Sequence, residues 1–229
     1  ADLGGIQFRL LNRSKGPAVQ GPRTQADRAL YKAAIQKLIS DVTDLTIIED
    51  GVEDLLVENN EVVGVVGLTG GKYTARSVVI TTGTFLKGMI HRGADRIPAG
   101  RIGEAPANKL SERLYDLGLN LGRLKTGTPA RLNKDSINWD ALERQPADDD
   151  PVPFSFLTER IHNPQIECAV THTTPETHSI IQSNIDKSAV FSGAISGKGP
   201  RYCPSIEDKV TRFADRTSHQ VFLEPEGLD

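Results

Sequence analysis

Residues 75–82 constrain the fold more than any other segment. Their centre, Val78-Val79-Ile80, is a continuous run of β-branched residues, which is typical of a strand buried on both faces of a parallel sheet. The run leads into Thr82-Gly83-Thr84-Phe85. A glycine in this position is typical of the place where an α/β sheet ends and a nucleotide packs against the strand. The segment therefore predicts an α/β fold, with a plain strand-to-loop turn at Gly83 as the alternative to a nucleotide contact.

Length and charge exclude several classes of protein. A chain of 229 residues can bury about 70% of its extended surface, enough for one large domain or two small ones. Its 27 basic and 30 acidic side chains give a net charge of −3, which argues against disorder and against a strongly basic nucleic-acid module. Any contact with nucleic acid must therefore come from a local patch. No apolar run approaches the ~20 residues that cross a bilayer, so we predict no membrane association.

The few cysteines and the scattered histidines argue against a metal site. Cys168 and Cys203 are too few for a disulfide scaffold or a four-cysteine zinc site, and they suit a reducing compartment. His172 and His178 lack the spacing of a helical metal pair. We therefore predict no bound metal and a cytoplasmic protein. The only methionine is Met89, so Ala1 follows either a removed initiator or a longer preceding chain.

Local patterns predict the helices and strands. Glycine and proline punctuate residues 1–22 as a loop, in which Arg9, Arg13 and Lys15 form a small basic cluster. Thr24 with Asp27 predicts an N-cap box for a helix that ends near Ser40. Hairpin turns are expected at Glu58-Asn59-Asn60 and at Gly70-Gly71. Strands are predicted at residues 46–49, 52–57, 61–68, 75–82, 166–171, 190–195 and 220–223, further helices at 108–117, 175–185 and 205–214, and a solvated loop at 147–153.

The segment 197–209 carries the most informative chemistry. Ser205 and Asp208 have the spacing of a capping box, which places Cys203 just outside a helix N-terminus. There the helix dipole and the nearby Arg201 favour the thiolate, and the glycine-rich approach offers backbone N–H groups to a phosphate. The residue types alone leave an alternative open, in which Cys203 is a small buried hydrophobe beside a tight turn.

The first half of a dinucleotide-binding unit is absent from these residues. No G-x-G-x-x-G motif opens a helix here, so the loop that would bind a pyrophosphate is missing. If the parent protein binds a dinucleotide, we expect that element to lie outside this chain. Cys168 stands in a strand-like run without a neighbouring glycine, proline or cation, and we expect it to pack in the core.

Seven motifs spread along the chain resemble one family. They are GIQFRLLN (5–12), SKGPAV (14–19), QADR (25–28), TGTF (82–85), GRLKTGTP (122–129), GPRYCPSIEDK (199–209) and FLEPEGL (222–228). The motifs occur from end to end in the family's order. On these residues the chain resembles the MnmG family, also called GidA, of tRNA uridine 5-carboxymethylaminomethyl modification enzymes.

The resemblance implies an α/β architecture made of part of a glutathione-reductase-like FAD domain and an inserted NADH-binding-type α/β domain. Residues 1–90 would be a partial FAD-binding domain without the N-terminal G-x-G-x-x-G unit. Residues 91–220 would be the inserted NAD(H)-binding or substrate domain, and residues 221–229 would return toward the FAD domain. The chain then looks like an internal piece of a longer protein, and we expect it to be inactive by itself.

Members of this family are homodimeric flavoproteins that use FAD, NADH and a folate-derived one-carbon unit. The resemblance implies that the intact protein acts with the GTPase MnmE to form 5-carboxymethylaminomethyl on wobble uridine 34 of tRNA. It implies a cytoplasmic enzyme, or a mitochondrial one in a eukaryote. Two alternatives remain open: a related folate- and FAD-dependent tRNA uracil methyltransferase, and a non-catalytic module that contributes dimer or MnmE contacts.

The resemblance also assigns functional residues. Cys203 matches a cysteine proposed to act at the uracil C5/C6 centre, with Arg201 and Tyr202 as neighbours that orient substrate or nicotinamide. Val52 and Ala107 match positions that contact FAD. The segment assigned to NAD(H) comprises Gly199, Pro200, Arg201, Tyr202, Cys203, Pro204, Ser205, Ile206, Glu207, Asp208, Lys209, Val210, Thr211, Arg212 and Phe213. Lys125 and Arg131 are candidate phosphate contacts, with plain surface charge as the alternative.

Overall fold

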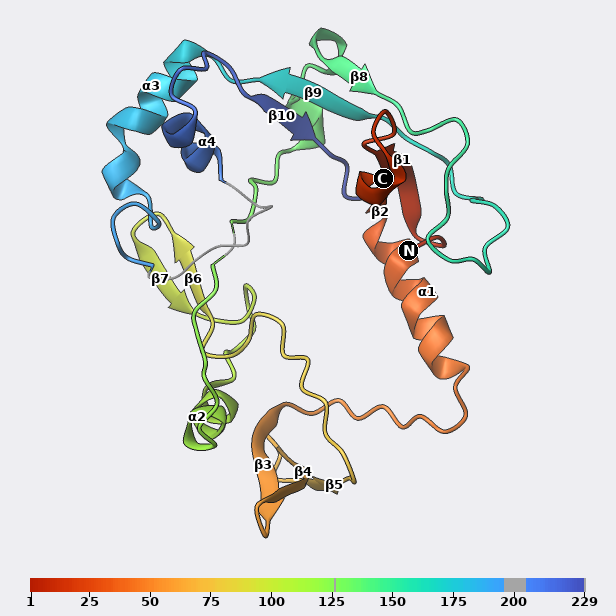
Figure 1. The fold of residues 1–229 in the computed structure, drawn as a ribbon, viewed down its shortest axis with the longest axis vertical. Coiled ribbons are helices and arrows are strands. Elements are labelled where there is room, and N and C mark those ends of the chain that lie inside the picture. The colour runs from red at the N-terminus through yellow and green to blue at the C-terminus, as the bar shows by residue number, and fades with distance from the viewer. Residues whose placement is uncertain (126, 196–204, 229) are drawn as a thin grey trace. The chain divides into compact units, whose positions relative to one another are not determined.

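The fold is α/β, as predicted (Figure 1). The computed structural model describes residues 1–125, 127–195 and 205–228. The chain divides into two compact units, each discontinuous in sequence. Unit 1 comprises Ala1–Thr46, Pro129–His178 and Phe213–Asp229, and unit 2 comprises Ile47–Thr128 and Ser179–Arg212. The domain bounds 1–90, 91–220 and 221–229 remain a prediction.

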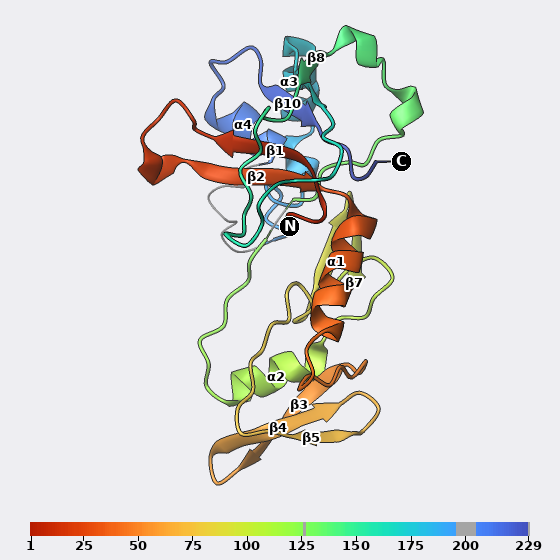
Figure 2. The same ribbon diagram turned by 90° about the vertical axis from the view of Figure 1, so that its right-hand side faces the viewer.

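Unit 1 contains two antiparallel sheets and the helix α1 (Arg28–Ser40). In the first sheet β1 (Gly5–Leu11) pairs with β2 (Gly21–Ala26), as Figure 2 shows. In the second, β9 (Cys168–His172) lies between β8 (Glu143–Gln145) and β10 (Gln220–Leu223). Three short 3-10 helices complete the unit: Pro17–Val19, Lys134–Ser136 and Trp139–Ala141.

The prediction that residues 1–22 form a loop is wrong, because much of this segment is the β1–β2 hairpin. Gly5 and Gly21 are the first residues of the two strands and do not interrupt them. Ile6 and Phe8 of β1 are fully buried, and the Phe8 ring centroid lies 6.1 Å from that of Phe154. Burying such a side chain contributes about 1.5–3 kcal/mol, which explains why the glycine-rich segment is ordered as strands.

The helix α1 ends at Ser40 as predicted, but its N-cap is Asp27 and not Thr24. The Asp27 Oδ1 atom accepts a hydrogen bond from the Leu30 backbone N–H at 2.8 Å, whereas Thr24 lies within β2. The backbone of β2 continues to Ala26, so only Asp27 is positioned to bind the first free N–H groups of the helix. The Leu30 N–H is also the main reason why the pKa of Asp27 is lowered.

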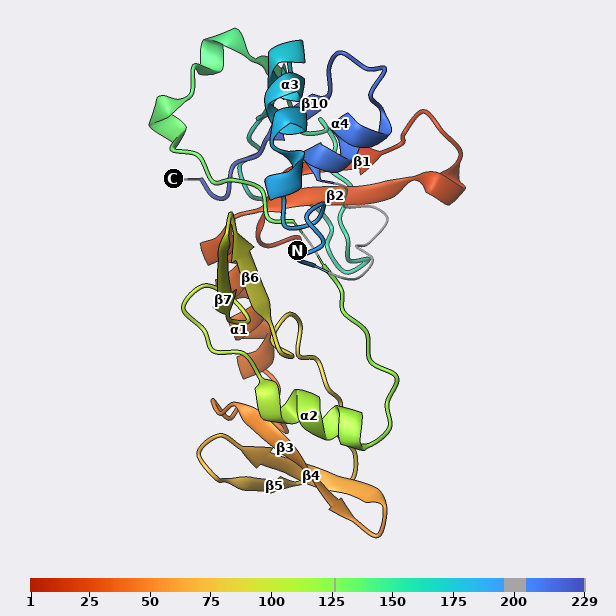
Figure 3. The same cartoon turned by 90° about the vertical axis from the view of Figure 1, so that its left-hand side faces the viewer.

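Unit 2 is built on the sheet of β3 (Val52–Glu58), β4 (Glu61–Gly67) and β5 (Lys72–Thr74). The helix α2 (Asn108–Asp116) lies against this sheet, as Figure 3 shows. Leu55 of β3 and Leu110 and Leu114 of α2 form the buried core, surrounded by Val57, Val65, Val78, Leu86 and Leu121. Unit 2 also holds the hairpin of β6 (Met89–Arg92) and β7 (Asp95–Pro98).

The two predicted hairpin turns of unit 2 are confirmed. Asn59 and Asn60 connect β3 to β4 with φ of 47° and 67°, the left-handed values that a two-residue turn of this kind requires. The Gly67 N–H donates to the Gly71 carbonyl oxygen at 2.7 Å across the turn between β4 and β5. Gly118 follows α2 with φ of 74°, so its predicted role in ending that helix is confirmed as well.

Three predicted strands are absent from the described structure. Residues 46–49 and 75–82 form no strand. The Ala75 N–H donates to the Val63 carbonyl oxygen of β4 at 2.9 Å, but the run then leaves the sheet, and Val79 is 85% exposed. A β-branched run forms a strand only where other strands satisfy its backbone, and the described sheets are antiparallel and do not include it. Residues 190–195 form turns instead, in which the Ser192 N–H donates to the Ser188 carbonyl oxygen at 2.8 Å.

The remaining predicted elements are confirmed with small shifts at their ends. They are α2, β9, β10, α3 (Pro175–Ser183) and α4 (Ile206–Arg212). A 3-10 turn, Ile185–Lys187, follows α3. No helix in the described ranges has the length and apolar character needed to span a membrane.

Candidate functional site: an arginine-lined pocket

Most of the motif around the predicted catalytic thiol lies outside the described residues. This holds for Gly199, Pro200, Arg201, Tyr202, Cys203 and Pro204. Their roles in catalysis and NAD(H) binding therefore stay predictions.

The capping box that follows this motif is confirmed. The Ser205 Oγ atom accepts from the Asp208 N–H at 3.2 Å, and Asp208 Oδ2 accepts from the Ser205 N–H at 3.2 Å. Within α4, Val210 is 1% exposed and the Thr211 hydroxyl donates to the Glu207 carbonyl oxygen at 2.7 Å. These two side chains are therefore engaged within the protein. Ile206, Lys209, Arg212 and Phe213 are half-buried or exposed.

The two positions assigned to FAD lie in the same unit. Val52 is the first residue of β3, and Ala107 is the N-cap residue of α2, which packs on β3. The neighbouring residues Glu53 and Lys109 form an ion pair of 2.6 Å. The Ala107 N–H donates to the Phe85 carbonyl oxygen at 2.7 Å, so it is already used within the protein.

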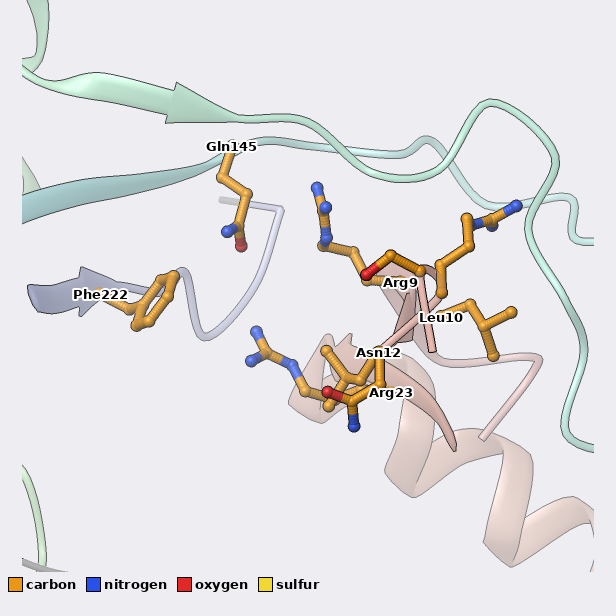
Figure 4. Close-up of a pocket in the computed structure, with 9 residues that line it drawn as sticks. Arg9, Leu10, Asn12, Arg23, Gln145 and Phe222 are labelled. Atoms are coloured by element: carbon orange, nitrogen blue, oxygen red, sulfur yellow. The ribbon is translucent and has the colours of Figure 1, made fainter. Parts of the chain in front are cut away.

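The described residues hold a pocket of about 590 Å³ in unit 1 that is lined by three arginines. Residues 9–14, from β1 and the turn after it, face Arg23 of β2, Gln145 at the end of β8 and Phe222 of β10. Figure 4 shows the side chains of Gln145 and Phe222 on one side and those of the β1–β2 hairpin on the other. Elements far apart in the sequence thus build one cavity.

The three arginines of the pocket have different partners. Arg13 and Arg23 each form an ion pair of 2.8 Å, with Asp148 and Glu224 respectively. Arg9 donates instead to the Pro146 carbonyl oxygen at 2.6 Å and has no carboxylate partner among the described residues. The pocket therefore holds three guanidinium groups against two carboxylates, and its wall carries an excess of positive charge.

Asp148 connects the pocket to the backbone of β1. Its Oδ2 atom accepts from the Leu10 N–H at 2.7 Å as well as from Arg13. Burial raises the pKa of Asp148, but these hydrogen bonds and the charges of Arg13 and Arg9 outweigh that effect, so the pKa is lowered. The carboxylate is therefore ionised at neutral pH and holds the rim of the pocket in place.

Arg9 and Arg23 lie directly opposite each other in the β1–β2 register. Directly opposite residues share a face of the sheet, and like charges there are destabilising. The Arg23 Nε atom is also buried and has no hydrogen-bond partner in the described structure. Leaving such a donor unsatisfied costs about 1–3 kcal/mol. The pocket thus presents an unbalanced charge and an unused donor.

The sequence indicated only a part of this site. Arg9 and Arg13 form a small basic cluster with Lys15 in the sequence, and Phe222 lies in a predicted strand and a family motif. Arg23 and Gln145 carry no local signal. The pattern that links Arg9 to Arg23 is the pairing of two strands, and residues 1–22 were predicted to be a loop. A hairpin assignment for the first 26 residues would have placed the two arginines together.

Other candidate residues lie away from this pocket's lining. Arg131 forms an ion pair of 2.9 Å with Glu226, so a phosphate would have to compete with that carboxylate. Lys125 is half-buried and forms no ion pair with another described residue. Cys168 is fully buried, and this burial raises the pKa of its thiol. The prediction that Cys168 packs in the core is therefore confirmed.

A buried histidine pair forms a second polar cluster in unit 1. The Thr173 Oγ1 atom lies 2.7 Å from His178 Nε2 and accepts from the His219 N–H at 2.8 Å. The two imidazole rings stack with centroids 5.1 Å apart. Within the described ranges, no group of three His, Cys, Asp or Glu side chains is arranged to hold a metal ion.

Comparison with known proteins gives a match over the whole chain. The family model described as glucose inhibited division protein A matches residues 1–229. A solved structure, that of GidA from Aquifex aeolicus in its form I crystal, superposes with a TM-score of 0.88 at 48% identity. The match covers 99% of this chain and 39% of that one.

Two curated relatives carry the name tRNA uridine 5-carboxymethylaminomethyl modification enzyme MnmG. The protein from Thermodesulfovibrio yellowstonii is 53% identical over 99% of this chain. The protein from Granulibacter bethesdensis is 54% identical over 100% of it. The chain spans 36% and 37% of the length of these two relatives.

Proposed function

Because the chain belongs to the family described as glucose inhibited division protein A, we propose that it is part of an FAD-dependent enzyme that modifies the wobble uridine of tRNA. The observation that carries this proposal is the identity of 53% and 54% to proteins named for that modification, over nearly every residue of the chain. Identity at this level over the whole chain favours the same reaction over the alternative of a tRNA uracil methyltransferase.

The proposed FAD contacts are compatible with unit 2 in part. Val52 is 37% exposed and Ala107 is half-buried, so both retain surface for a van der Waals contact. Because the Ala107 N–H already donates to Phe85, only its carbonyl oxygen and methyl group remain for the flavin nucleotide. FAD, when bound, would supply hydride transfer; NADH and a folate-derived one-carbon unit complete the proposed set of cofactors.

Cys203 is the proposed nucleophile of the reaction. Its thiolate would form a carbon–sulfur bond to C6 of the uracil and move the electron pair to C5, which then becomes the nucleophile. C5 would form a carbon–carbon bond to the folate-derived carbon, and the folate nitrogen would leave that carbon as the amine adds. Loss of the C5 proton and release of the sulfur would then restore the C5–C6 double bond. Arg201 and Tyr202 would orient the substrate or the nicotinamide, and residues 199–213 would hold NAD(H).

The proposed partners follow from the same family membership. They are tRNA as substrate, the GTPase MnmE and a second copy of the intact enzyme. We propose a cytoplasmic setting for a bacterial protein and a mitochondrial one for a eukaryotic protein. The non-catalytic alternative predicts that substitution of Cys203 leaves the tRNA modification unchanged.

Complementation tests this function directly. The open reading frame that contains these residues is expressed in bacteria lacking their own family member, and tRNA nucleosides are analysed by mass spectrometry. We expect 5-carboxymethylaminomethyluridine to return. Its absence from cells with folded protein would overturn the function, and the appearance of a methylated uridine would support the methyltransferase instead.

Two cysteine variants separate catalysis from folding in the same assay. Cys203→Ser is expected to abolish the modified nucleoside. Cys168→Ala is the matched control, because Cys168 is fully buried with a raised thiol pKa and is expected to retain the modification. Unchanged modification by Cys203→Ser would remove the proposed nucleophile while leaving the family function in place.

A further inference from the structure

We propose that the arginine-lined pocket of unit 1 binds a nucleotide, with the phosphate held by Arg9, Arg13 and Arg23 and the base placed against Phe222. The phosphate chemistry is common to an RNA strand and to a dinucleotide cofactor. Taking the nucleotide from tRNA rests on the proposed function. The binding of a nucleotide phosphate by this pocket does not.

The charge of the pocket favours an anion. Arg9 and Arg23 are directly opposite in the strand register, an arrangement that an empty hairpin would disfavour. Asp148 and Glu224 form ion pairs with Arg13 and Arg23, and the charge of Arg9 acts on Asp148 without an ion pair of its own, so three guanidinium groups share two carboxylates. A bound phosphate would balance the excess charge.

The available donors favour a phosphate over a smaller anion. Guanidinium groups match phosphate oxygens in bidentate geometry, and here they come from three positions around one cavity. The buried Arg23 Nε has no partner in the described structure. Two successive phosphates of an RNA strand, or the pyrophosphate of a dinucleotide, present four non-bridging oxygens that can accept from this donor and from Arg9 and Arg13 together, whereas a carboxylate has two.

The turn that carries part of the pocket is held in one conformation. Asn12 has a left-handed φ of 56°, and its amide donates to the Val19 carbonyl oxygen at 2.9 Å. The Gln20 amide donates to the carbonyl oxygens of Arg13 and Lys15, both at 3.1 Å. A pre-formed turn lowers the entropic cost of binding.

The opposite wall suits a base. Phe222 is 39% exposed and offers a ring for stacking, which contributes about 1–3 kcal/mol per base in single-stranded nucleic acid sites. The side-chain amide of Gln145 lies beside it in the pocket and can donate to and accept from a base edge. A volume of about 590 Å³ falls in the usual range of small-molecule sites, roughly 300–1,000 Å³.

Binding measurements on the purified chain test the proposal. The probe is a fluorescein-labelled oligouridylate, followed by anisotropy, with inorganic phosphate and NADH as separate competitors. Arg9→Gln and Arg23→Gln are each expected to weaken binding about tenfold, the loss of one charge-assisted hydrogen bond. Arg23→Lys keeps the charge but lacks Nε and the planar fork, so we expect a similar loss.

The matched control is Arg160→Gln. Arg160 is an exposed arginine of unit 1 that does not line the pocket, so its loss changes the net charge equally and is expected to leave binding within about twofold. Phe222→Leu is expected to weaken oligouridylate binding while leaving competition by inorganic phosphate unchanged.

The salt dependence gives an independent reading of the phosphate contact. Each lost contact should reduce the slope of log K against log salt by about 0.7 for a single strand. An arginine variant that binds oligouridylate more weakly, while NADH still competes as in the parent chain, assigns the pocket to an RNA strand. An arginine variant that binds oligouridylate as before but is no longer competed by NADH assigns the pocket to a dinucleotide.

The proposal is overturned if Arg9→Gln and Arg23→Gln bind oligouridylate, and are competed by NADH, as strongly as Arg160→Gln. Arg9→Gln keeps the test valid if Arg23→Gln fails to fold, because Arg9 has only a backbone carbonyl as its partner. Failure of the complementation assay with intact nucleotide binding would refute the tRNA modification and leave the pocket assignment standing.

Discussion

The sheets of the two units are held together in different ways. In unit 2 the strands β3, β4 and β5 follow one another through short turns, and apolar contacts of Leu55, Leu110 and Leu114 anchor α2 on them. In unit 1 many of the contacts are polar and join distant segments. Asp2 accepts from the N–H groups of Phe154 and Ser155, 152 and 153 positions away.

The two units differ in whether their stabilising interactions can be recognised in the sequence. A hairpin with its turn residues is a local pattern, and an apolar triad follows from helical spacing. A carboxylate that accepts from backbone N–H groups 152 and 153 positions later leaves no periodic pattern in the sequence. The stability of unit 1 should therefore depend on single polar side chains and on pH. The stability of unit 2 should depend on the volume of its buried apolar side chains.

The largest effect is expected where unit 1 does rely on an apolar side chain. Phe8 is 1% exposed and contacts Phe154, so Phe8→Ala should lower the free energy of unfolding of unit 1 by about 4 kcal/mol. Urea unfolding followed by the fluorescence of Trp139, the only tryptophan and a residue of unit 1, measures it. Leu11→Ala, at a 40% exposed position of the same strand, is the control.

The corresponding test of unit 2 is Leu114→Ala. The side chain is 5% exposed in the core of α2 and β3, and its truncation should cost about 3 kcal/mol. Hydrogen exchange of β3–β5 should accelerate while Trp139 fluorescence stays native. Leu117→Ala, 39% exposed after the same helix, should have little effect. Equal losses for both variants would mean that the apolar triad does not anchor α2.

The substitution Asp2→Ala tests how strongly unit 1 depends on polar contacts. The Asp2 carboxylate accepts from Phe154 and Ser155 and from the Thr158 hydroxyl at 2.8 Å, and Asp2→Ala should destabilise unit 1 by about 2 kcal/mol. Hydrogen exchange at residues 154–158 measures the local opening. Protection unchanged from the parent chain would show that the loop is held by other contacts.

The pH dependence sharpens the same contrast. Burial raises the pKa of Asp2, but its three hydrogen bonds outweigh that and lower it below the ordinary 3.8, and the pKa values of Asp27 and Asp148 are lowered as well. A carboxylate with a lowered folded pKa stabilises the fold above the unfolded pKa. That stability is lost as the pH falls through the folded value.

Unit 1 should therefore lose stability below about pH 4. In unit 2 the pKa of Asp50 is lowered, mainly through the Thr69 hydroxyl. The urea midpoint of Trp139 fluorescence should fall with acid more steeply than the exchange protection of β3–β5, and Asp2→Asn should flatten the first curve. If both units lost stability in parallel as the pH falls, unit 1 would not be the more acid-sensitive of the two.

The smallest effect is expected at the end of α2. Gly118 has a left-handed φ of 74°, so Gly118→Ala should destabilise unit 2 by about 1 kcal/mol. Gly122→Ala is the matched control, because a Cβ there meets nothing and no positive φ is required. The difference between the two melting curves isolates the backbone strain.

The sequence predicted those elements that depend on residues close together in the chain. It identified the two turns of unit 2, α2 with its Gly118 end, and the Ser205–Asp208 cap, because each depends on residues within a few positions of one another. It failed at residues 75–82, where strand formation depends on partners that the described residues do not supply. It also missed the β1–β2 hairpin, where frequent glycines concealed the buried Ile6 and Phe8.

The residues of the pocket also fall into those that the sequence made recognisable and those that it did not. Arg9 and Arg13 stood out as a basic cluster, but Phe222 and Gln145 reach the pocket only through the pairing of β9 with β10 and β8. The family resemblance assigned roles around Cys203 and at Val52 and Ala107. Its motifs 5–12 and 222–228 contain Arg9 and Phe222 but did not predict that these segments meet. Cavities formed by distant strands need tertiary contacts that no residue pattern encodes by itself.

The discontinuity of unit 1 has a consequence during synthesis on a ribosome. β9 is made well before β10, so one edge of this strand stays unpaired in the nascent chain until residues 220–223 emerge. The Arg23–Glu224 ion pair and the hydrogen bond from the Leu228 N–H to Asp27 wait for the same segment. An exposed strand edge invites pairing with other chains. Unit 1 thus depends on β10, which is made after β8 and β9, and truncation before Gln220 would leave a template for aggregation.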